Sequence, residues 1–211
     1  MKAIFCVAAI PNKDETTSTF QEYVGLFKKI ASSSKYGMKP FDAPIIACEN
    51  EGKLGLIHGT MEFPSKQHVL DLFADEEYVT NAIPLRKTAF IRLKASVVEI
   101  DEESSTAVFA VGAIKNVNTE TSTLMEYLKG WKEISGSSQY DKVESIVDER
   151  MKKSSNSDDN GDVDDTLIHG FMTFDSVDAM RQMFDSKEYK DHAAKYRTNA
   201  FAELKGLDLS S

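Results

Sequence analysis

The chain has 211 residues, of which 41% are hydrophobic and 28% charged, values typical of a folded globular protein with a hydrophobic core. No apolar run approaches the roughly 18 residues that a membrane helix needs, so a membrane-spanning protein is excluded. The formal net charge of −9 argues against nucleic acid, and against an anionic membrane surface, as the main partner.

The excess negative charge lies entirely in the second half of the chain. Residues 1–100 carry 12 basic and 12 acidic side chains, whereas residues 101–211 carry 13 and 22. Much of the excess falls in residues 101–103 and 158–165, among Ser, Asn or Gly, which is the composition of solvated loops. The second stretch loosely follows a calcium-binding loop, but Asn156 takes the position of the first aspartate and Leu167 that of the bidentate glutamate. We therefore expect no calcium site there.

The first hundred residues predict an alternation of strands and helices. Residues 3–10 read as a strand with Phe5, Val7 and Ala9 on one face, and Thr17-Ser18-Thr19 begins a helix with an apolar stripe. The order is strand, helix, strand, strand, helix, strand, over residues 3–10, 17–30, 44–49, 56–63, 65–73 and 89–100.

This order occurs twice, because the chain contains an internal repeat. Residues 3–36 match residues 107–140 at 16 of 34 positions without a gap, and residues 56–94 match residues 167–205 at 16 of 39. We therefore predict two ferredoxin-like repeats, 1–100 and 107–211, joined by the acidic linker 101–106, with an acidic loop insertion near 150–166 in the second.

A ferredoxin-like repeat covers one face of its sheet with helices and leaves the other face bare. Two repeats in one chain can bury both bare faces by packing sheet to sheet. The predicted fold is thus α+β, an intrachain pseudo-dimeric α+β barrel with internal pseudo-two-fold symmetry. Since the chain supplies its own sheet partner, we expect a monomer.

Short motifs carry a family resemblance. Tyr36-Gly37, then Phe63-Pro64-Ser65, then Glu77-Tyr78 with Arg86 eight residues later, resemble the dimeric α+β barrel proteins of the domain-of-unknown-function family numbered 1330. The second copy keeps much of the pattern, with Tyr140, Phe174, Ser176, Glu188-Tyr189 and Arg197, but has Asp141 and Asp175 in place of the Gly and the Pro. The resemblance implies a fold whose members usually pair as homodimers and include cofactor-free monooxygenases, isomerases, polyketide cyclases and some haem proteins.

His58 and His169 are the candidate catalytic residues. Alternation along residues 56–63 places His58 and Glu62 on the face opposite Ile57 and Met61, and hence in the space between the two sheets. A neutral imidazole near a carboxylate in an enclosed space could act as a general base or bind a polar group of a ligand. The alternative is a hydrogen-bonded strand histidine that both copies inherited from the duplication.

Arg86 and Arg197 are candidate ligand-binding residues, and so are Glu62, Tyr36 and Tyr140. Each arginine could clamp a carboxylate or enolate, cap the second helix of its repeat, or pair with Glu77 or Glu188. The two tyrosines end the first helix of each repeat, where packing is the competing role.

Cys6 and Cys48 are too few for a zinc cluster and form no CxxC pair, so we predict neither a metal site nor a cofactor, and read Cys6 as a buried free thiol. Phosphate-loop and hydrolase motifs are absent from the sequence. The apolar start of the chain recurs within it at residues 107–114, so we read it as a core strand rather than a signal peptide and expect a cytoplasmic protein.

Two main functions remain open from the sequence, and a third, haem binding through one histidine, rests only on distant analogy. One is a small-molecule-binding barrel, acting as a cofactor-free enzyme of the isomerase, cyclase or monooxygenase type in the cavity between the sheets. The other is a non-catalytic structural or partner-binding protein whose inter-sheet space is filled by side chains. The residues do not decide whether the chain is an enzyme.

Overall fold

The computed structural model describes residues 1–13, 17–117, 120–135, 143–150 and 166–210. The acidic stretch of residues 158–165, Asn156 of the calcium-loop comparison, and Tyr140 lie outside the described residues. Among the residues that are described, no helix is long and apolar enough to cross a membrane.

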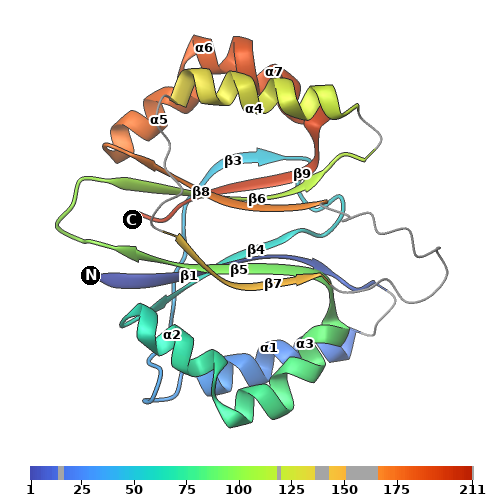
Figure 1. The fold of residues 1–211 in the computed structure, drawn as a ribbon, viewed down its shortest axis with the longest axis vertical. Helices are drawn as coiled ribbons and strands as arrows, with labels where there is room; N and C mark the ends of the chain where they lie inside the picture. Colours follow the sequence, from blue (N-terminus) through green and yellow to red (C-terminus); the bar gives the residue numbers. More distant parts are fainter. Residues whose placement is uncertain (14–16, 118–119, 136–142, 151–165, 211) are drawn as a thin grey trace.

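The fold is α+β, with two antiparallel sheets facing each other and helices on both outer sides (Figure 1). The first half contributes β1 (Lys2–Pro11), α1 (Thr17–Ala31), β2 (Lys39–Pro40), β3 (Ile45–Glu49), β4 (Ile57–Phe63), α2 (Lys66–Phe73), the π-helical turn η1 (Tyr78–Ala82), α3 (Ile83–Ala89) and β5 (Phe90–Ile100). The second half contributes β6 (Ala107–Lys115), α4 (Thr121–Ser135), β7 (Val143–Arg150), β8 (Leu167–Phe174), α5 (Val177–Asp185), α6 (Lys187–Tyr189), η2 (Lys190–Ala194), α7 (Lys195–Ala200) and β9 (Phe201–Asp208).

The two halves exchange one strand each, which the sequence did not predict. The five-stranded sheet has the order β2-β4-β1-β5-β7, and the four-stranded sheet has the order β3-β9-β6-β8. Strand β3 of the first half therefore belongs to the second sheet, and β7 of the second half belongs to the first (Figure 1). The expectation that each repeat keeps its strands within its own sheet is wrong.

The exchange preserves the pairing register in both sheets. Glu49 of β3 lies opposite Leu204 of β9, and Glu149 of β7 lies opposite Leu93 of β5. Leu93 and Leu204 correspond to each other in the sequence repeat. The exchanged strands thus hold equivalent places in the two sheets.

Alternation along each strand divides its side chains between two cores. On β1, Phe5 and Ala9 face the helices, while Ile4 and Cys6 face the other sheet. The helix-side core of the first half includes Tyr23, Phe27 and Ile30 from the apolar stripe of α1, as the helical spacing predicts. Trp131 occupies the position of Phe27 in the second half and is likewise buried.

The space between the sheets is occupied by side chains of both halves. One cluster joins Ile4, Val98, Phe171, Leu207 and their neighbours, and a second joins Ala8, Leu56, Ile114 and Leu167. The sheets therefore bury each other's inner faces, and the interior between them is packed with apolar groups.

Candidate functional site

A cavity of about 550 Å³ lies between α1 and the first sheet, within the size range of small-molecule sites. It is on the helix-covered face of that sheet, not in the space between the sheets. Strand residues of β1 and β4 form its floor, and residues of α1 form its roof. We expected a ligand cavity between the two sheets, whereas this cavity lies between a sheet and its helices.

Small side chains in the floor leave this volume open. Ala9 and Gly59 face the helices from β1 and β4, where larger residues would fill the space. A Cβ atom on Gly59 would meet only Val7 Cγ1, at an ordinary contact distance of 3.8 Å. The position therefore accepts a side chain that would project into the cavity.

The walls are mainly aromatic and aliphatic, and charge enters at two places. Phe5, Phe20, Phe27, Phe73 and Phe90 all line the cavity. At the surface, the exposed Lys28 and Asp42 border it, and within the lining lies the buried guanidinium of Arg86, which is 3% exposed. Such a site suits a flat apolar molecule with one polar or anionic group.

Aromatic rings and a phenol hold Arg86 in place. Its Nη1 donates a hydrogen bond of 2.6 Å to the hydroxyl oxygen of Tyr78, and its guanidinium lies 5.6 Å and 6.0 Å from the ring centroids of Tyr78 and Phe73. Glu77, an expected partner of Arg86, instead forms an exposed ion pair with Lys29. Arg86 therefore belongs to the cavity wall.

Arg197, the counterpart of Arg86, hydrogen-bonds to a carboxylate as well as to a phenol. Its Nε donates to Glu49 Oε2 at 2.7 Å, and its Nη1 donates to the Tyr189 hydroxyl at 3.1 Å. Burial opposes the charge of Arg197, but Tyr189 and Glu49 outweigh it and raise the pKa of the guanidinium above its ordinary value. The expected partner Glu188 is replaced by Glu49, which the exchanged strand β3 supplies.

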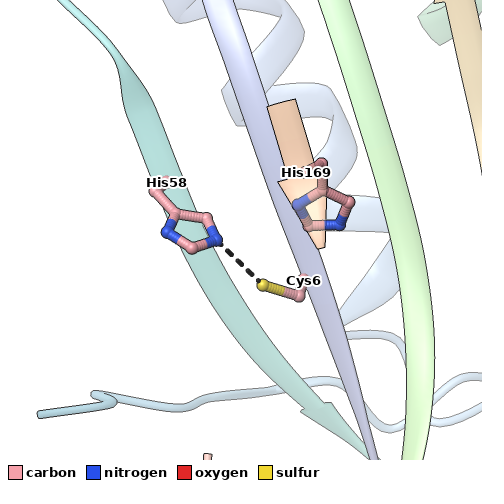
Figure 2. Close-up of side chains that lie close together, drawn as sticks. All are labelled: Cys6, His58 and His169. Atoms are coloured by element: carbon pink, nitrogen blue, oxygen red, sulfur yellow. Dashed lines mark hydrogen bonds between the residues drawn. The ribbon is translucent and has the colours of Figure 1, made fainter. Parts of the chain in front are cut away.

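His58 and His169 lie between the sheets, as the strand alternation predicts, and their rings meet edge to face with centroids 5.9 Å apart. Cys6 of β1 joins them: its Sγ is 3.3 Å from His58 Nε2 (Figure 2). His58 Nδ1 is 3.0 Å from the carbonyl oxygen of Lys205, to which it donates. These histidines thus lie between the sheets, His58 on the first and His169 on the second, and the first sheet separates them from the cavity.

Burial keeps all three groups uncharged in the protein alone. It lowers the pKa of His58 to about 4, and burial together with nearby His58 and Lys94 lowers the pKa of His169 to about 3. Burial also raises the pKa of the Cys6 thiol well above its ordinary value. Both imidazoles are therefore neutral at neutral pH, and the lone pair of His58, on Nε2, faces the Cys6 thiol.

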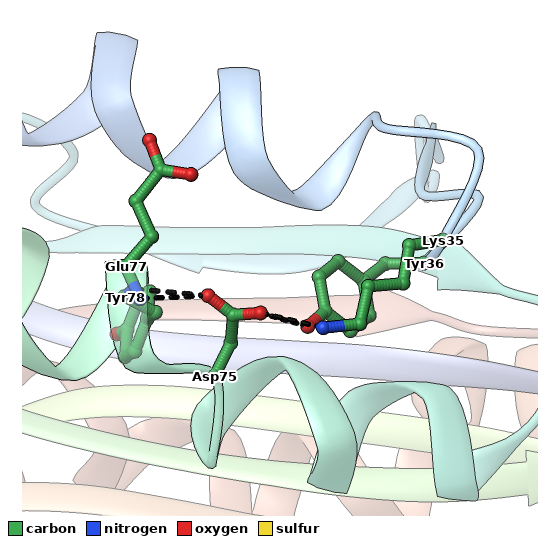
Figure 3. Close-up of polar contacts among 5 residues, drawn as sticks. All are labelled: Lys35, Tyr36, Asp75, Glu77 and Tyr78. Atoms are coloured by element: carbon green, nitrogen blue, oxygen red, sulfur yellow. Dashed lines mark hydrogen bonds and ion pairs between the residues drawn. The ribbon is translucent and has the colours of Figure 1, made fainter.

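Tyr36 has a structural contact, as its packing role predicts. Its hydroxyl donates a hydrogen bond to Asp75 Oδ2. Lys35 Nζ forms an ion pair with the same oxygen at 2.7 Å (Figure 3). Asp75 Oδ1 accepts from the backbone N–H groups of Glu77 and Tyr78 at 2.9 and 3.3 Å. Because α1 ends at Ala31, Tyr36 lies in the turn after that helix and not at its end as expected, and it ties this turn to the one that follows α2.

Glu62 lies at the margin of the inter-sheet space and not beside His58. Its carboxylate is 4.0 Å from Lys2 Nζ, and the side chain is about one-third exposed. The expected pairing of a histidine with this carboxylate is therefore absent from the described contacts of His58, which are to Cys6 and the Lys205 carbonyl.

Sequence reasoning missed the features that define both sites. In the sequence, Gly59 and Ala9 could be recognised only as small residues of strands. Whether small residues leave a cavity depends on how the helix above them packs, which the sequence does not reveal. Cys6 showed only as a lone thiol, but it lies one strand away from His58 because β1 pairs with β4. Its replacement by Ala110 in the second copy was the one available signal of a position specific to the first half.

No protein-family model matches the chain, and no curated protein matches it significantly. Among solved structures, an anthrone oxidase-like protein aligns over 98% of this chain and 90% of its own, at 9% identity and a TM-score of 0.38. Two proteins proposed to be monooxygenases, from Lactobacillus acidophilus and Fusobacterium nucleatum, align over 98% of this chain and 93% and 90% of theirs, at 8% and 11% identity and TM-scores of 0.32.

Proposed function

We propose that the chain binds a flat, largely apolar small molecule with an anionic or hydrogen-bond-accepting group in the cavity under α1. The observation that carries this proposal is a buried guanidinium, Arg86, in the wall of an otherwise apolar cavity of about 550 Å³. Apolar walls supply affinity through burial, and a few placed polar groups fix orientation. Arg86 is the group that would receive a carboxylate, phenolate or enolate oxygen.

Proton transfer within this cavity would fall to its own polar residues. The lining includes Tyr23, Lys28, Asp42 and Arg86, but neither histidine. A cofactor-free isomerase, cyclase or monooxygenase built on His58 or His169 would need its substrate between the sheets, where apolar clusters are packed. We therefore propose ligand binding as the function. Any turnover would depend on polar residues that line the cavity, such as Lys28 and Asp42 at the surface.

The packed inter-sheet space also supports a structural role, which is part of the alternative function that the sequence left open. There the sheets hold the two halves together, as expected of a structural core. We assign that role to the inter-sheet space and the ligand-binding role to the cavity on the other face of the first sheet.

Thermal unfolding with 2-naphthoate and with neutral 2-acetylnaphthalene tests the proposal. We expect naphthoate to raise the melting temperature of the wild type, because a ligand that binds only the folded state stabilises it. Gly59→Val fills the floor of the cavity and should abolish that shift. Gly170→Val, the same change at the corresponding position of the second half, should retain it.

The charge preference separates specific binding from general apolar adsorption. We expect Arg86→Gln to weaken naphthoate binding by about tenfold or more, the usual value of a charge-assisted contact, and to leave acetylnaphthalene binding nearly unchanged. Naphthoate binding that survives Gly59→Val, or an equal loss for both ligands in Arg86→Gln, would contradict the proposed function.

A further inference from the structure

We propose that Cys6, His58 and His169 bind one thiophilic transition-metal ion between the two sheets. The site is separate from the proposed ligand cavity, since it lies on the other face of the first sheet. It departs from our expectation that the chain holds no metal, because the fold unites a lone cysteine with two histidines that are distant in sequence.

The three donor atoms already form a compact cluster. One donor atom each from Cys6, His58 and His169 lies within 4.8 Å of the others, on strands β1, β4 and β8. Metal–sulfur and metal–nitrogen bonds of about 2.3 and 2.0 Å place the ligand atoms of a trigonal ion about 3.7 Å apart. The 3.3 Å contact of Cys6 with His58 would open slightly, and the other two separations, which are no more than 4.8 Å, would close by at most about 1 Å.

His58 is oriented as a metal ligand is. Its Nδ1 donates to the backbone carbonyl of Lys205 at 3.0 Å, so its lone pair is on Nε2, the atom that faces Cys6. In a metal-binding histidine, the ring nitrogen that does not bind the metal usually donates a hydrogen bond to a carbonyl or carboxylate. This hydrogen bond fixes the tautomer and the ring plane. A Cβ on Gly112 would lie 2.9 Å from His58 Cγ, so the glycine gives this ring its room.

His169 supplies an independent observation. Both of its ring nitrogens are buried and have no hydrogen-bond partner among the described residues. A buried polar group left unsatisfied costs about 1–3 kcal/mol. Figure 2 shows this ring beside Cys6 and His58, with all three side chains meeting in one space. An ion in that space would satisfy one of these two nitrogens, neither of which has a partner among the described residues.

The donor set and its surroundings indicate the kind of ion. One thiolate and two imidazoles suit late first-row ions, and a trigonal site with two histidines and one cysteine is a copper geometry. Cu⁺ would form a complex of zero net charge with the Cys6 thiolate, whereas Zn²⁺ would leave one positive charge in a buried site near Lys94 and Lys205. Binding replaces the Cys6 S–H bond with a sulfur–metal bond and releases that proton to solvent, with no change of oxidation state.

An anaerobic titration of the 211-residue chain with Cu⁺, in competition with the chromophoric chelator bicinchoninate, tests this site. We expect the wild type to withdraw one equivalent of Cu⁺, and Cys6→Ala and His169→Ala each to lose at least tenfold in affinity. Cys48→Ala removes the other, half-buried thiol and should bind as the wild type does. Zn²⁺ in the same format should bind more weakly.

Alanine at position 6 has a precedent, since Ala110 fills the corresponding position of the second copy. Circular dichroism with a chelator present establishes that each variant is folded before its affinity is compared. X-ray absorption of the loaded wild type should show one sulfur and two nitrogen neighbours. Binding that is unchanged in folded Cys6→Ala, or a spectrum without a sulfur neighbour, would overturn the proposal.

Discussion

The residues of the recurring motifs have structural roles in the first half of the molecule. Gly37 adopts a φ of +63°, and a Cβ there would lie 3.1 Å from the ring of Pro64, so Tyr36-Gly37 and Phe63-Pro64 meet across one turn. Tyr78 accepts the hydrogen bond of Arg86. The motif spacing therefore reflects how two turns and a helix fit together, and only Arg86 among these residues reaches the cavity.

Asp75 makes a testable contribution to acid stability. Hydrogen bonds from Lys35 and Tyr36 hold the pKa of this carboxyl well below its usual range. A group with a lowered pKa in the folded state stabilises the protein above its unfolded pKa, about 3.9, and loses that contribution as the pH falls further. We expect Asp75→Asn to be less stable than the wild type at pH 7, with the difference shrinking below about pH 4.

Urea unfolding at several pH values measures this difference directly. Glu76→Gln, which neutralises the exposed neighbouring carboxylate, serves as the control and should follow the wild-type curve. A stability difference between Asp75→Asn and the wild type that stays constant from pH 7 to about pH 3 would show that Asp75 acts through packing alone.

At the level of elements, a buried carboxylate fixes the segment that leads into β4. Glu203 of β9 is 3% exposed and accepts backbone hydrogen bonds from Gly52, Leu54 and Leu56 at 2.8, 2.8 and 3.1 Å. The segment lies immediately before His58, and Glu203 lies two residues before Lys205, whose carbonyl orients that histidine. Glu203 thus holds together parts of the two halves that build the inter-sheet site.

We expect Glu203→Gln to lower the free energy of unfolding by about 1–3 kcal/mol, because a neutral amide replaces the charged acceptor and its NH₂ group faces backbone donors. Glu99→Gln, at an exposed position of β5, should cost less than about 0.5 kcal/mol. Equal effects of the two substitutions on chemical unfolding would refute this role for Glu203.

The six elements predicted for the first half are present, but the helical segment formed by η1 and α3 was not predicted, and neither were the partners of the strands. Alternation on β4 placed His58 and Met61 on opposite faces correctly, since a strand's period alone decides that. Pairing of β3 with β9 involves residues about 160 positions apart, as between Ile45 and Leu207, and a five-residue strand carries no signal for its partner. The cavity was not predicted, because the helical spacing of apolar residues such as Phe27 and Phe73 is the same whether their side chains pack against other side chains or line a cavity.

At the level of the whole molecule, the two halves of the chain together build a pair of facing sheets, each with strands from both halves. We propose that the full chain is a monomer for this reason, with a mass of 23.5 kDa by light scattering. The exchanged strands predict the behaviour of the first half alone. Residues 1–100, produced separately, should form a dimer in which β3 of each copy pairs with β5 of the other, as β3 pairs with β9 in the intact chain.

Light scattering of both species provides the comparison. A stable dimer of the full chain at low micromolar concentration would contradict the monomer, and a folded, monomeric fragment of residues 1–100 would show that the first half needs no exchanged partner. Far-ultraviolet circular dichroism establishes that the fragment is folded before its mass is interpreted.

The central claim is that the ligand of this protein lies between α1 and the first sheet, against Arg86. A crystal structure of the full chain with bound 2-naphthoate tests that claim most directly. The account predicts the naphthalene rings over Ala9 and Gly59, with the carboxylate within hydrogen-bonding distance of the Arg86 guanidinium. Naphthoate between the two sheets beside His58 and His169, or an empty cavity with naphthoate only on the outer surface, would contradict it.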